Sequence, residues 1–95
     1  MDIEQVFLQI RDIAKQHQVK KLVLFGSRAR GDYQEKSDID LAVYGCQDFL
    51  EFSCQLEEEI WSLLRLDLID MNSVSVSKGL IDEIERDGVV LYEAV

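Results

Sequence analysis

The sequence predicts a single small α/β domain, in which helices pack on a sheet. Amphipathic segments with helical spacing alternate along the chain with short apolar runs of strand length. The chain has 95 residues, which matches the usual size of one domain. We therefore expect residues 1–95 to form one folded unit.

The first half of the chain predicts one helix and two strands. Residues 2–17 carry apolar side chains at helical spacing, which indicates an amphipathic helix with one buried stripe. Residues 22–25 form a continuous apolar run before Gly26, which favours a strand buried on both faces. Residues 38–44 predict a second strand, closed by Gly45. The segment between the strands leaves both a crossover and an antiparallel or irregular connection open.

The second half continues the alternation. Residues 48–64 repeat apolar side chains at steps of three and four, which predicts a second long helix. Residues 66–71 predict a third strand and residues 78–87 a short helix. Gly88 is expected to end that helix before the apolar segment 89–91.

Acidic residues concentrate in the C-terminal half. Residues 1–46 carry seven basic and seven acidic side chains, whereas residues 47–95 carry three and twelve, for a net charge of −9. A negative field opposes contact with phosphate backbones, which argues against general nucleic-acid binding. The acidic half is interpreted either as a solubilising surface or as a face for a basic partner.

The sequence also argues against a membrane segment and a soft-metal site. The N-terminus has no basic and apolar leader pattern, and no run of about 18 apolar residues occurs. We expect a cytoplasmic protein with no membrane partner. Cys46, Cys54 and His17 are too few to ligate zinc or an iron–sulfur cluster.

Two short motifs lie close together between residues 25 and 40. Gly26 allows a tight turn after the first strand, and Ser27 is placed to cap a short helix whose amides would face a phosphate. Asp38 and Asp40 leave the same strand face about 7 Å apart and suit Mg²⁺, which prefers oxygen ligands. Each motif alone is commonly a plain turn or a solvated pair. Together they predict metal-assisted phosphoryl or nucleotidyl transfer.

This pattern resembles the signature of the polymerase-β-type nucleotidyltransferase superfamily, and most closely its minimal nucleotidyltransferase group. The resemblance rests on Gly26-Ser27, ten intervening residues and Asp38-x-Asp40, and it extends to the segment 87–93. It implies a mixed sheet flanked by helices. It also implies ATP bound with Mg²⁺, as two ions, and attack of an acceptor hydroxyl on the α-phosphate with loss of pyrophosphate.

The superfamily uses a third carboxylate from a later strand, and two candidates occur here. Asp67 and Asp70 are three residues apart, so they point to opposite faces of a strand and only one of them can join the first pair. Asp67 lies between apolar residues, as in the family pattern, and is favoured. Asp70 is interpreted as a solvated or capping residue at the strand end.

The resemblance also assigns roles to these residues. Asp38 and Asp40 would bind both metal ions, and Asp67 would bind one and possibly take the proton of the acceptor hydroxyl. The Gly26 amide and the Ser27 hydroxyl would hold the β- and γ-phosphates.

Two basic residues follow the predicted phosphate-binding turn at Gly26 and Ser27. Arg28 and Arg30 lie on the short helix, where they would neutralise triphosphate charge or contact a partner. Exposed arginines on such a helix are equally often structural or neutral, and both interpretations stay open.

The resemblance implies a protein partner. Larger relatives carry an added domain that binds the acceptor, and in the minimal group the partner is a small helical toxin of the HEPN type. The leading hypothesis is a protein adenylyltransferase that transfers AMP from ATP to a tyrosine of such a toxin and acts as its antitoxin. The alternatives are a non-catalytic binding antitoxin with a vestigial nucleotide site, or a transferase for an RNA end or small molecule with a partner-supplied acceptor site.

The helix predicted at 48–64 raises a question about self-association. Phe49, Phe52 and Trp61 would leave an apolar patch exposed and support a homo-oligomer, or they would pack internally. Internal packing is the favoured interpretation.

Overall fold

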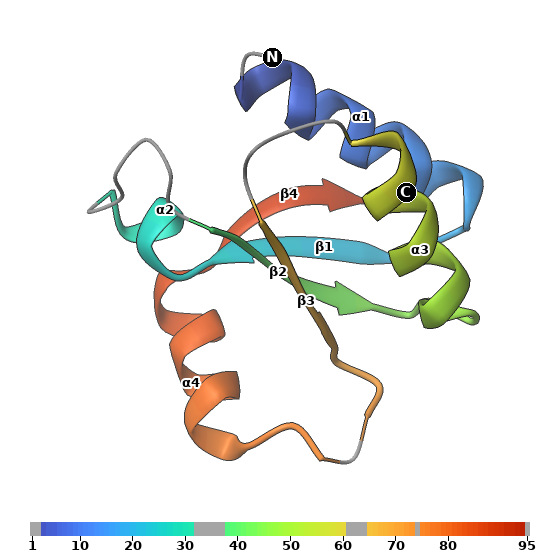
Figure 1. Cartoon of the computed structure of the whole chain (residues 1–95). Coiled ribbons are helices and arrows are strands. Elements are labelled where there is room, and N and C mark those ends of the chain that lie inside the picture. Colours follow the sequence, from blue (N-terminus) through green and yellow to red (C-terminus); the bar gives the residue numbers. More distant parts are fainter. Residues whose placement is uncertain (1–2, 32–37, 61–64, 74, 95) are drawn as a thin grey trace.

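The computed structural model describes residues 3–31, 38–60, 65–73 and 75–94 (Figure 1). Helices and strands alternate as predicted. No helix within these ranges combines the length and the apolar character needed to cross a membrane. In chain order the elements are α1 (Ile3–Gln16), β1 (Lys21–Phe25), α2 (Ser27–Arg30), β2 (Ile39–Tyr44), α3 (Phe49–Glu59), β3 (Leu66–Asp70), α4 (Lys78–Asp87) and β4 (Val89–Glu93).

The four strands form one mixed sheet in the order β3-β2-β1-β4. β1 pairs antiparallel with both β2 and β4, whereas β2 pairs parallel with β3. The sequence left the connection between the first two strands open; these strands, β1 and β2, are antiparallel neighbours. The mixed sheet flanked by helices confirms the predicted fold class.

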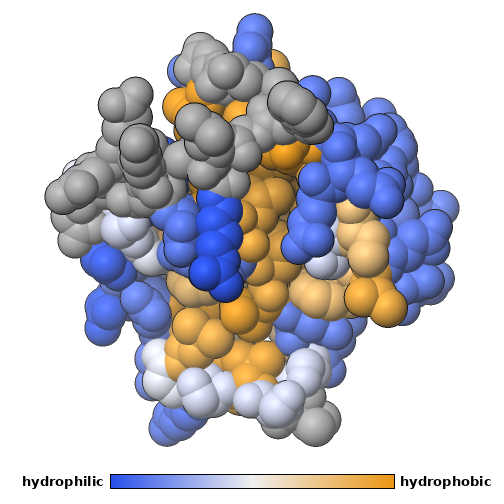
Figure 2. All heavy atoms as spheres, in the orientation of Figure 1, coloured by the Kyte–Doolittle hydropathy of each residue, from blue (hydrophilic) through white to orange (hydrophobic). Residues whose placement is uncertain are grey.

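The two faces of the sheet are covered unequally. The larger apolar cluster joins α1 and α3 to one face, through buried residues such as Ile10, Leu41 and Phe52. On the other face a smaller cluster joins α4 to the sheet. β1 contributes to both clusters, and its apolar residues are buried as predicted. β3 is an edge strand, and all of its residues are half-buried. Figure 2 shows an apolar band that runs down the middle of the face in view.

Some boundaries differ from the sequence predictions. The helix predicted to reach residue 64 ends at Glu59, because Ile60 has an extended backbone and turns its side chain into the core. Residues 61–64, with Trp61, lie outside the described part of the chain. β3 ends at Asp70, one residue early, and β4 continues two residues further than predicted, to Glu93.

The aromatic residues of α3 pack inward. Phe52 is fully buried, and Phe49 packs partly against the larger cluster. This supports internal packing for these two side chains, and self-association stays a prediction.

A bulge in β4 is stabilised by a side chain of α1. Leu22 pairs with Tyr92 and Val23 with Val90, which leaves Leu91 without a partner of its own in β1. The Arg11 Nε–H donates a hydrogen bond of 2.8 Å to the Leu91 carbonyl. A charged donor from the helix thus satisfies a carbonyl in the disrupted ladder.

We predict that Arg11→Ala lowers the free energy of unfolding by about 1 kcal/mol, because the Leu91 carbonyl loses its charged donor. Urea unfolding measures the change. Lys15→Ala is the matched control, since Lys15 is an exposed basic residue on the same helix. Equal midpoints for the two variants would show that the Arg11 contact contributes nothing to stability.

Candidate active site

The turn after β1 is built around glycine. Gly26 has φ 78° and ψ −154°, a backbone conformation that L side chains rarely adopt, and it occupies the N-cap of α2. The prediction that Ser27 caps this helix is wrong: Ser27 is the first helical residue, and no side-chain cap bond forms. The turn needs a positive φ at the capping position, which only glycine adopts easily. Gly31 ends the helix in the left-handed region, with its N–H bonded to the Ser27 carbonyl.

The Asp40 carboxylate packs directly on this turn. Phe25 is paired with Asp40 across the antiparallel strands β1 and β2, so the residue after Phe25 passes beside the Asp40 side chain. A Cβ placed on Gly26 would overlap Asp40 Oδ2 and lie 3.2 Å from Cγ. Glycine is therefore required here for space as well as for its backbone conformation.

Asp67 lies on the neighbouring strand at the same level. It pairs with Asp40 in the parallel register of β2 and β3. Ala42 and Ile69, two residues further along each strand, belong to the cluster under α4. Because strand side chains alternate, both carboxylates face the α4 side of the sheet.

Asp70 is located elsewhere. Three residues from Asp67, it lies on the opposite face, where its charge contributes to raising the pKa of the buried Cys46 thiol after burial itself. Its Oδ1 accepts a hydrogen bond of 3.0 Å from the backbone N–H of Asn72. The structure thus places Asp67, and not Asp70, beside Asp40.

The charges converge on Asp40. The pKa of Asp40 is raised from 3.8 to about 6. Burial is the largest cause, the negative charges of Asp67, Asp38 and Glu83 also raise the pKa in that order, and Arg30 lowers it. Asp38 is exposed and directly precedes β2. Glu83, from α4, was not anticipated from the sequence.

The two arginines of α2 have different surroundings. Arg30 Nη1 lies 3.0 Å from Glu83 Oε1, which links α2 to α4. Arg28 is half-buried on the same short helix. The Arg30 guanidinium therefore lies near the carboxylates of Glu83 and Asp40, next to the turn that the sequence predicts to bind a triphosphate.

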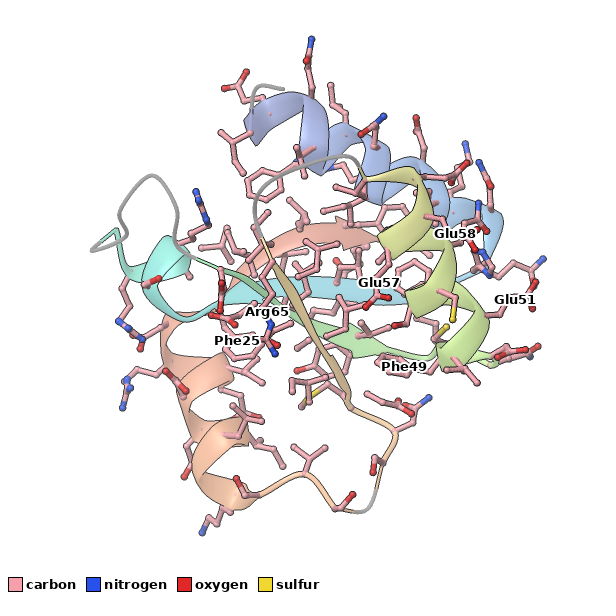
Figure 3. The ribbon with its side chains drawn as sticks, in the orientation of Figure 1. Phe25, Phe49, Glu51, Glu57, Glu58 and Arg65 are labelled. Carbon is pink, nitrogen blue, oxygen red and sulfur yellow. The ribbon has the colours of Figure 1, made fainter. Side chains whose placement is uncertain are left out.

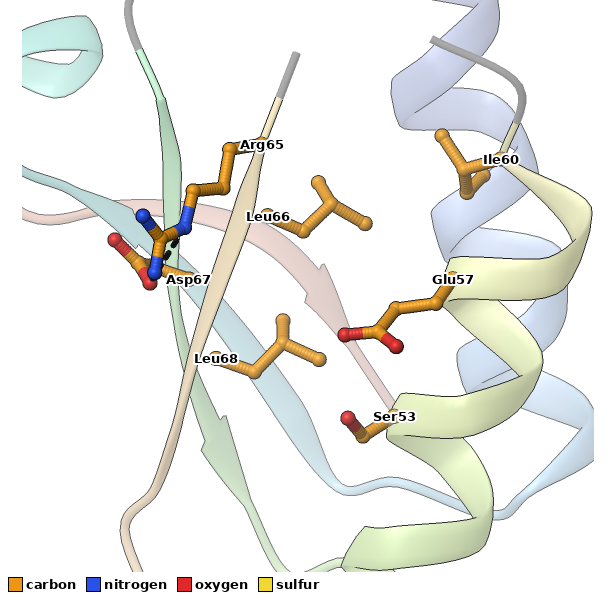
Figure 4. Close-up of a pocket in the computed structure, with 7 residues that line it drawn as sticks. All are labelled: Ser53, Glu57, Ile60, Arg65, Leu66, Asp67 and Leu68. Atoms are coloured by element: carbon orange, nitrogen blue, oxygen red, sulfur yellow. Dashed lines mark ion pairs between the residues drawn. The ribbon is translucent and has the colours of Figure 1, made fainter. Parts of the chain in front are cut away.

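A pocket of about 450 Å³ opens on the other side of β3 (Figure 4). Glu57 points into it from α3, opposite Leu66 and Leu68, and Asp67 lies at its border. Arg65 Nε lies 3.9 Å from Asp67 Oδ1; the Arg65 side chain is largely exposed and that of Asp67 about half exposed, so this ion pair is weak. Gly26 and Asp40 do not line the pocket.

The glutamates of α3 are separate from the carboxylate group. Glu51, Glu57 and Glu58 lie along α3 in Figure 3. α3 packs on the face of the sheet opposite to α4. The negative charge that acts on Asp40 therefore comes from Asp38, from Asp67 on β3 and from Glu83 on α4, and not from α3.

The donor set suits a hard divalent cation. Asp38, Asp40 and Asp67 offer carboxylate oxygens, the ligands that Mg²⁺ prefers, beside a turn with backbone amides. Within the ranges described, no three histidine, cysteine or acidic side chains are gathered into a ready-made metal site. The chemistry of these residues fits the cation, while the arrangement is more open than a closed coordination shell.

Comparison with known proteins identifies the family. Residues 8–94 match the family described as polymerase beta, nucleotidyltransferase. The chain belongs to this nucleotidyltransferase family. Two proteins of Methanocaldococcus jannaschii, each named "Putative protein adenylyltransferase", are 38% and 36% identical to it. The first match covers 67% of this chain and 78% of the relative, and the second covers 77% and 79%.

Solved structures share the nucleotidyltransferase fold. A crystal structure of a toxin–antitoxin with AMP-PNP superposes with a TM-score of 0.71 at 25% identity, over 93% of this chain and 73% of that one. A tri-AMPylated Shewanella oneidensis HEPN toxin in complex with MNT antitoxin gives 0.66 at 22% identity, over 96% and 72%. The second likeness concerns the fold alone.

We predict that Asp40→Asn stabilises the metal-free nucleotidyltransferase domain at pH 7.5 by about 1 kcal/mol, a value reduced by partial solvent exposure. The folded-state pKa of Asp40 is raised to about 6, so its charge destabilises the fold above that pH. As the pH falls from 6 toward 3.8, wild type takes up the proton and the difference disappears.

Urea unfolding in EDTA between pH 4 and 8 measures this difference. Asp70→Asn is the control, because Asp70 lies on the other face and its charge does not act on Asp40. A constant difference between Asp40→Asn and wild type across the range would contradict the prediction.

Proposed function

We propose that this nucleotidyltransferase transfers AMP from ATP, with Mg²⁺, to a tyrosine hydroxyl of a partner toxin of the HEPN type, and so acts as a cytoplasmic antitoxin. The supporting observation is the packing of the Asp40 carboxylate on the Gly26 turn, with Asp67 paired beside it. A metal-binding carboxylate and a phosphate-binding turn are adjacent in this arrangement. Nucleotidyl transfer requires both.

The proposal assigns a role to each residue. The Gly26 amide and the Ser27 hydroxyl would hold the β- and γ-phosphates at the start of α2. Asp38 and Asp40 would hold two Mg²⁺ ions, and Asp67 would hold one of them. When bound, the ions polarise the α-phosphate and stabilise the charge that develops on it.

The transfer step needs no reactant besides ATP and the acceptor hydroxyl. The acceptor oxygen forms a bond to the α-phosphorus, and the bond to the bridging oxygen of pyrophosphate breaks. The hydroxyl proton passes to a carboxylate, and Asp67 is the candidate, since it lies at the exposed edge strand of the group.

The choice of a protein acceptor rests on the relatives and on the openness of the site. The relatives in M. jannaschii carry the name of protein adenylyltransferases, and the superposed structure with AMP-PNP is a toxin–antitoxin. The carboxylate group lies on the less covered face of the sheet, with α4 packed beside it. A protein surface can reach such a site, and the acidic charge of the C-terminal half disfavours RNA.

We predict that Asp38→Asn, Asp40→Asn and Asp67→Asn each lower transfer at least 100-fold, because each removes a charged metal ligand. Asp70→Asn should retain activity, since Asp70 lies on the opposite face. The assay incubates the protein with the product of the adjacent gene and Mg-ATP, and measures an AMP-sized mass increment on a partner tyrosine.

Controls separate this proposal from simple masking of the toxin. EDTA should abolish the increment, and circular dichroism should show that each variant is folded. If wild type yields no increment with any nucleotide, the enzymatic proposal is wrong. If the Asp38→Asn/Asp40→Asn double variant protects cells from the toxin as well as wild type does, the protein acts by binding alone.

A further inference from the structure

α4 carries a charged residue on the stripe that packs toward the sheet. Leu80 and Ile84 join the apolar cluster on this face, and Ile84 is only 3% exposed. Glu83 lies on the same side of the helix and is half-buried, whereas its acidic neighbours Asp82 and Glu85 are exposed. An acidic residue on such a stripe needs a partner to offset its partial desolvation.

That partner is Arg30. Its Nη1 lies 3.0 Å from Glu83 Oε1, although the two residues are 53 positions apart in the chain. The side chains are 38% and 33% exposed, so water reaches the pair only in part. It connects the short helix after the glycine turn to a helix anchored on β1 by Ile84.

The ion pair lies beside the glycine turn. The backbone N–H of Arg30 donates a hydrogen bond of 3.1 Å to the Gly26 carbonyl, one helical turn away, and the Arg30 side chain contacts Glu83. A negatively charged triphosphate that approached the Gly26 turn would therefore meet the Arg30 guanidinium beside it.

We propose that Glu83 is a positioning residue of the nucleotide site, whose carboxylate fixes the Arg30 guanidinium next to the glycine turn so that it meets the triphosphate already oriented. The inference rests on the proposed function and adds to it a residue outside the signature motif. A glutamate repels phosphate, so Glu83 acts through Arg30 and not by touching the nucleotide. Its contribution is to reduce the conformational freedom that Arg30 loses when the nucleotide binds.

The test compares alanine variants of two glutamates on the same helix. Glu83→Ala should weaken binding of a non-hydrolysable ATP analogue with Mg²⁺ about tenfold, by loss of an oriented charged hydrogen bond. Glu85→Ala is the matched control, because Glu85 is exposed, and it should bind like wild type. Calorimetry gives Kd, and the transfer assay should show the KM for ATP rising while kcat stays within about twofold.

A double-variant cycle tests whether Glu83 acts through Arg30. Adding Glu83→Ala to Arg30→Ala should cause no further loss of affinity, because the residue to be positioned is already gone. Thermal unfolding confirms that the variants are folded. If Glu83→Ala does not fold, Glu83→Gln, of the same size, carries the test with an expected weakening of about threefold.

The outcomes distinguish this inference from the proposed function. If wild type binds and transfers nucleotide while Glu83→Ala matches Glu85→Ala, only the positioning role is overturned. A further loss of affinity on the Arg30→Ala background would also overturn it, since Glu83 would then act independently. If wild type binds no nucleotide at all, the proposed function fails, and the positioning role fails with it.

Discussion

The contact between the Asp40 carboxylate and the backbone of Gly26 holds the candidate site together. Antiparallel pairing sets Phe25 opposite Asp40, so the turn that follows β1 must pass beside that carboxylate. Only a residue without a Cβ fits there, and the positive φ independently favours glycine. The backbone of the turn proposed to bind phosphate and the carboxylate of a strand are therefore neighbours as a direct result of strand register.

This proximity has an energetic consequence that the rest of the fold must offset. Asp38, Asp67 and Glu83 all act on Asp40 in the direction that disfavours its charge, and Arg30 acts against them. A small domain has a limited core with which to balance such repulsion. Here the larger apolar cluster lies on the opposite face, under α1 and α3. The sheet thus separates the larger apolar cluster from the carboxylate group around Asp40.

The sequence predicted the longer helices and the strands, because they have a clear apolar period, and strand alternation correctly separated Asp67 from Asp70. It failed where the outcome depends on backbone geometry or tertiary packing. The helical position of Ser27 follows from the φ of Gly26, which a residue pattern does not reveal. The early end of α3 follows from the burial of Ile60, which depends on where that helix meets the sheet.

Glu83 was missed for a different reason, since its partner Arg30 lies far away in the chain and becomes identifiable only after α4 is placed on the sheet. The sequence does contain a signal, a glutamate directly before Ile84 on the stripe that also carries Leu80. A charge on such a stripe must either reach water or find a partner. Because the same helix turn packs Ile84 into the core and presents Glu83 to α2, a shift of α4 would change both the packing and the charge around Asp40.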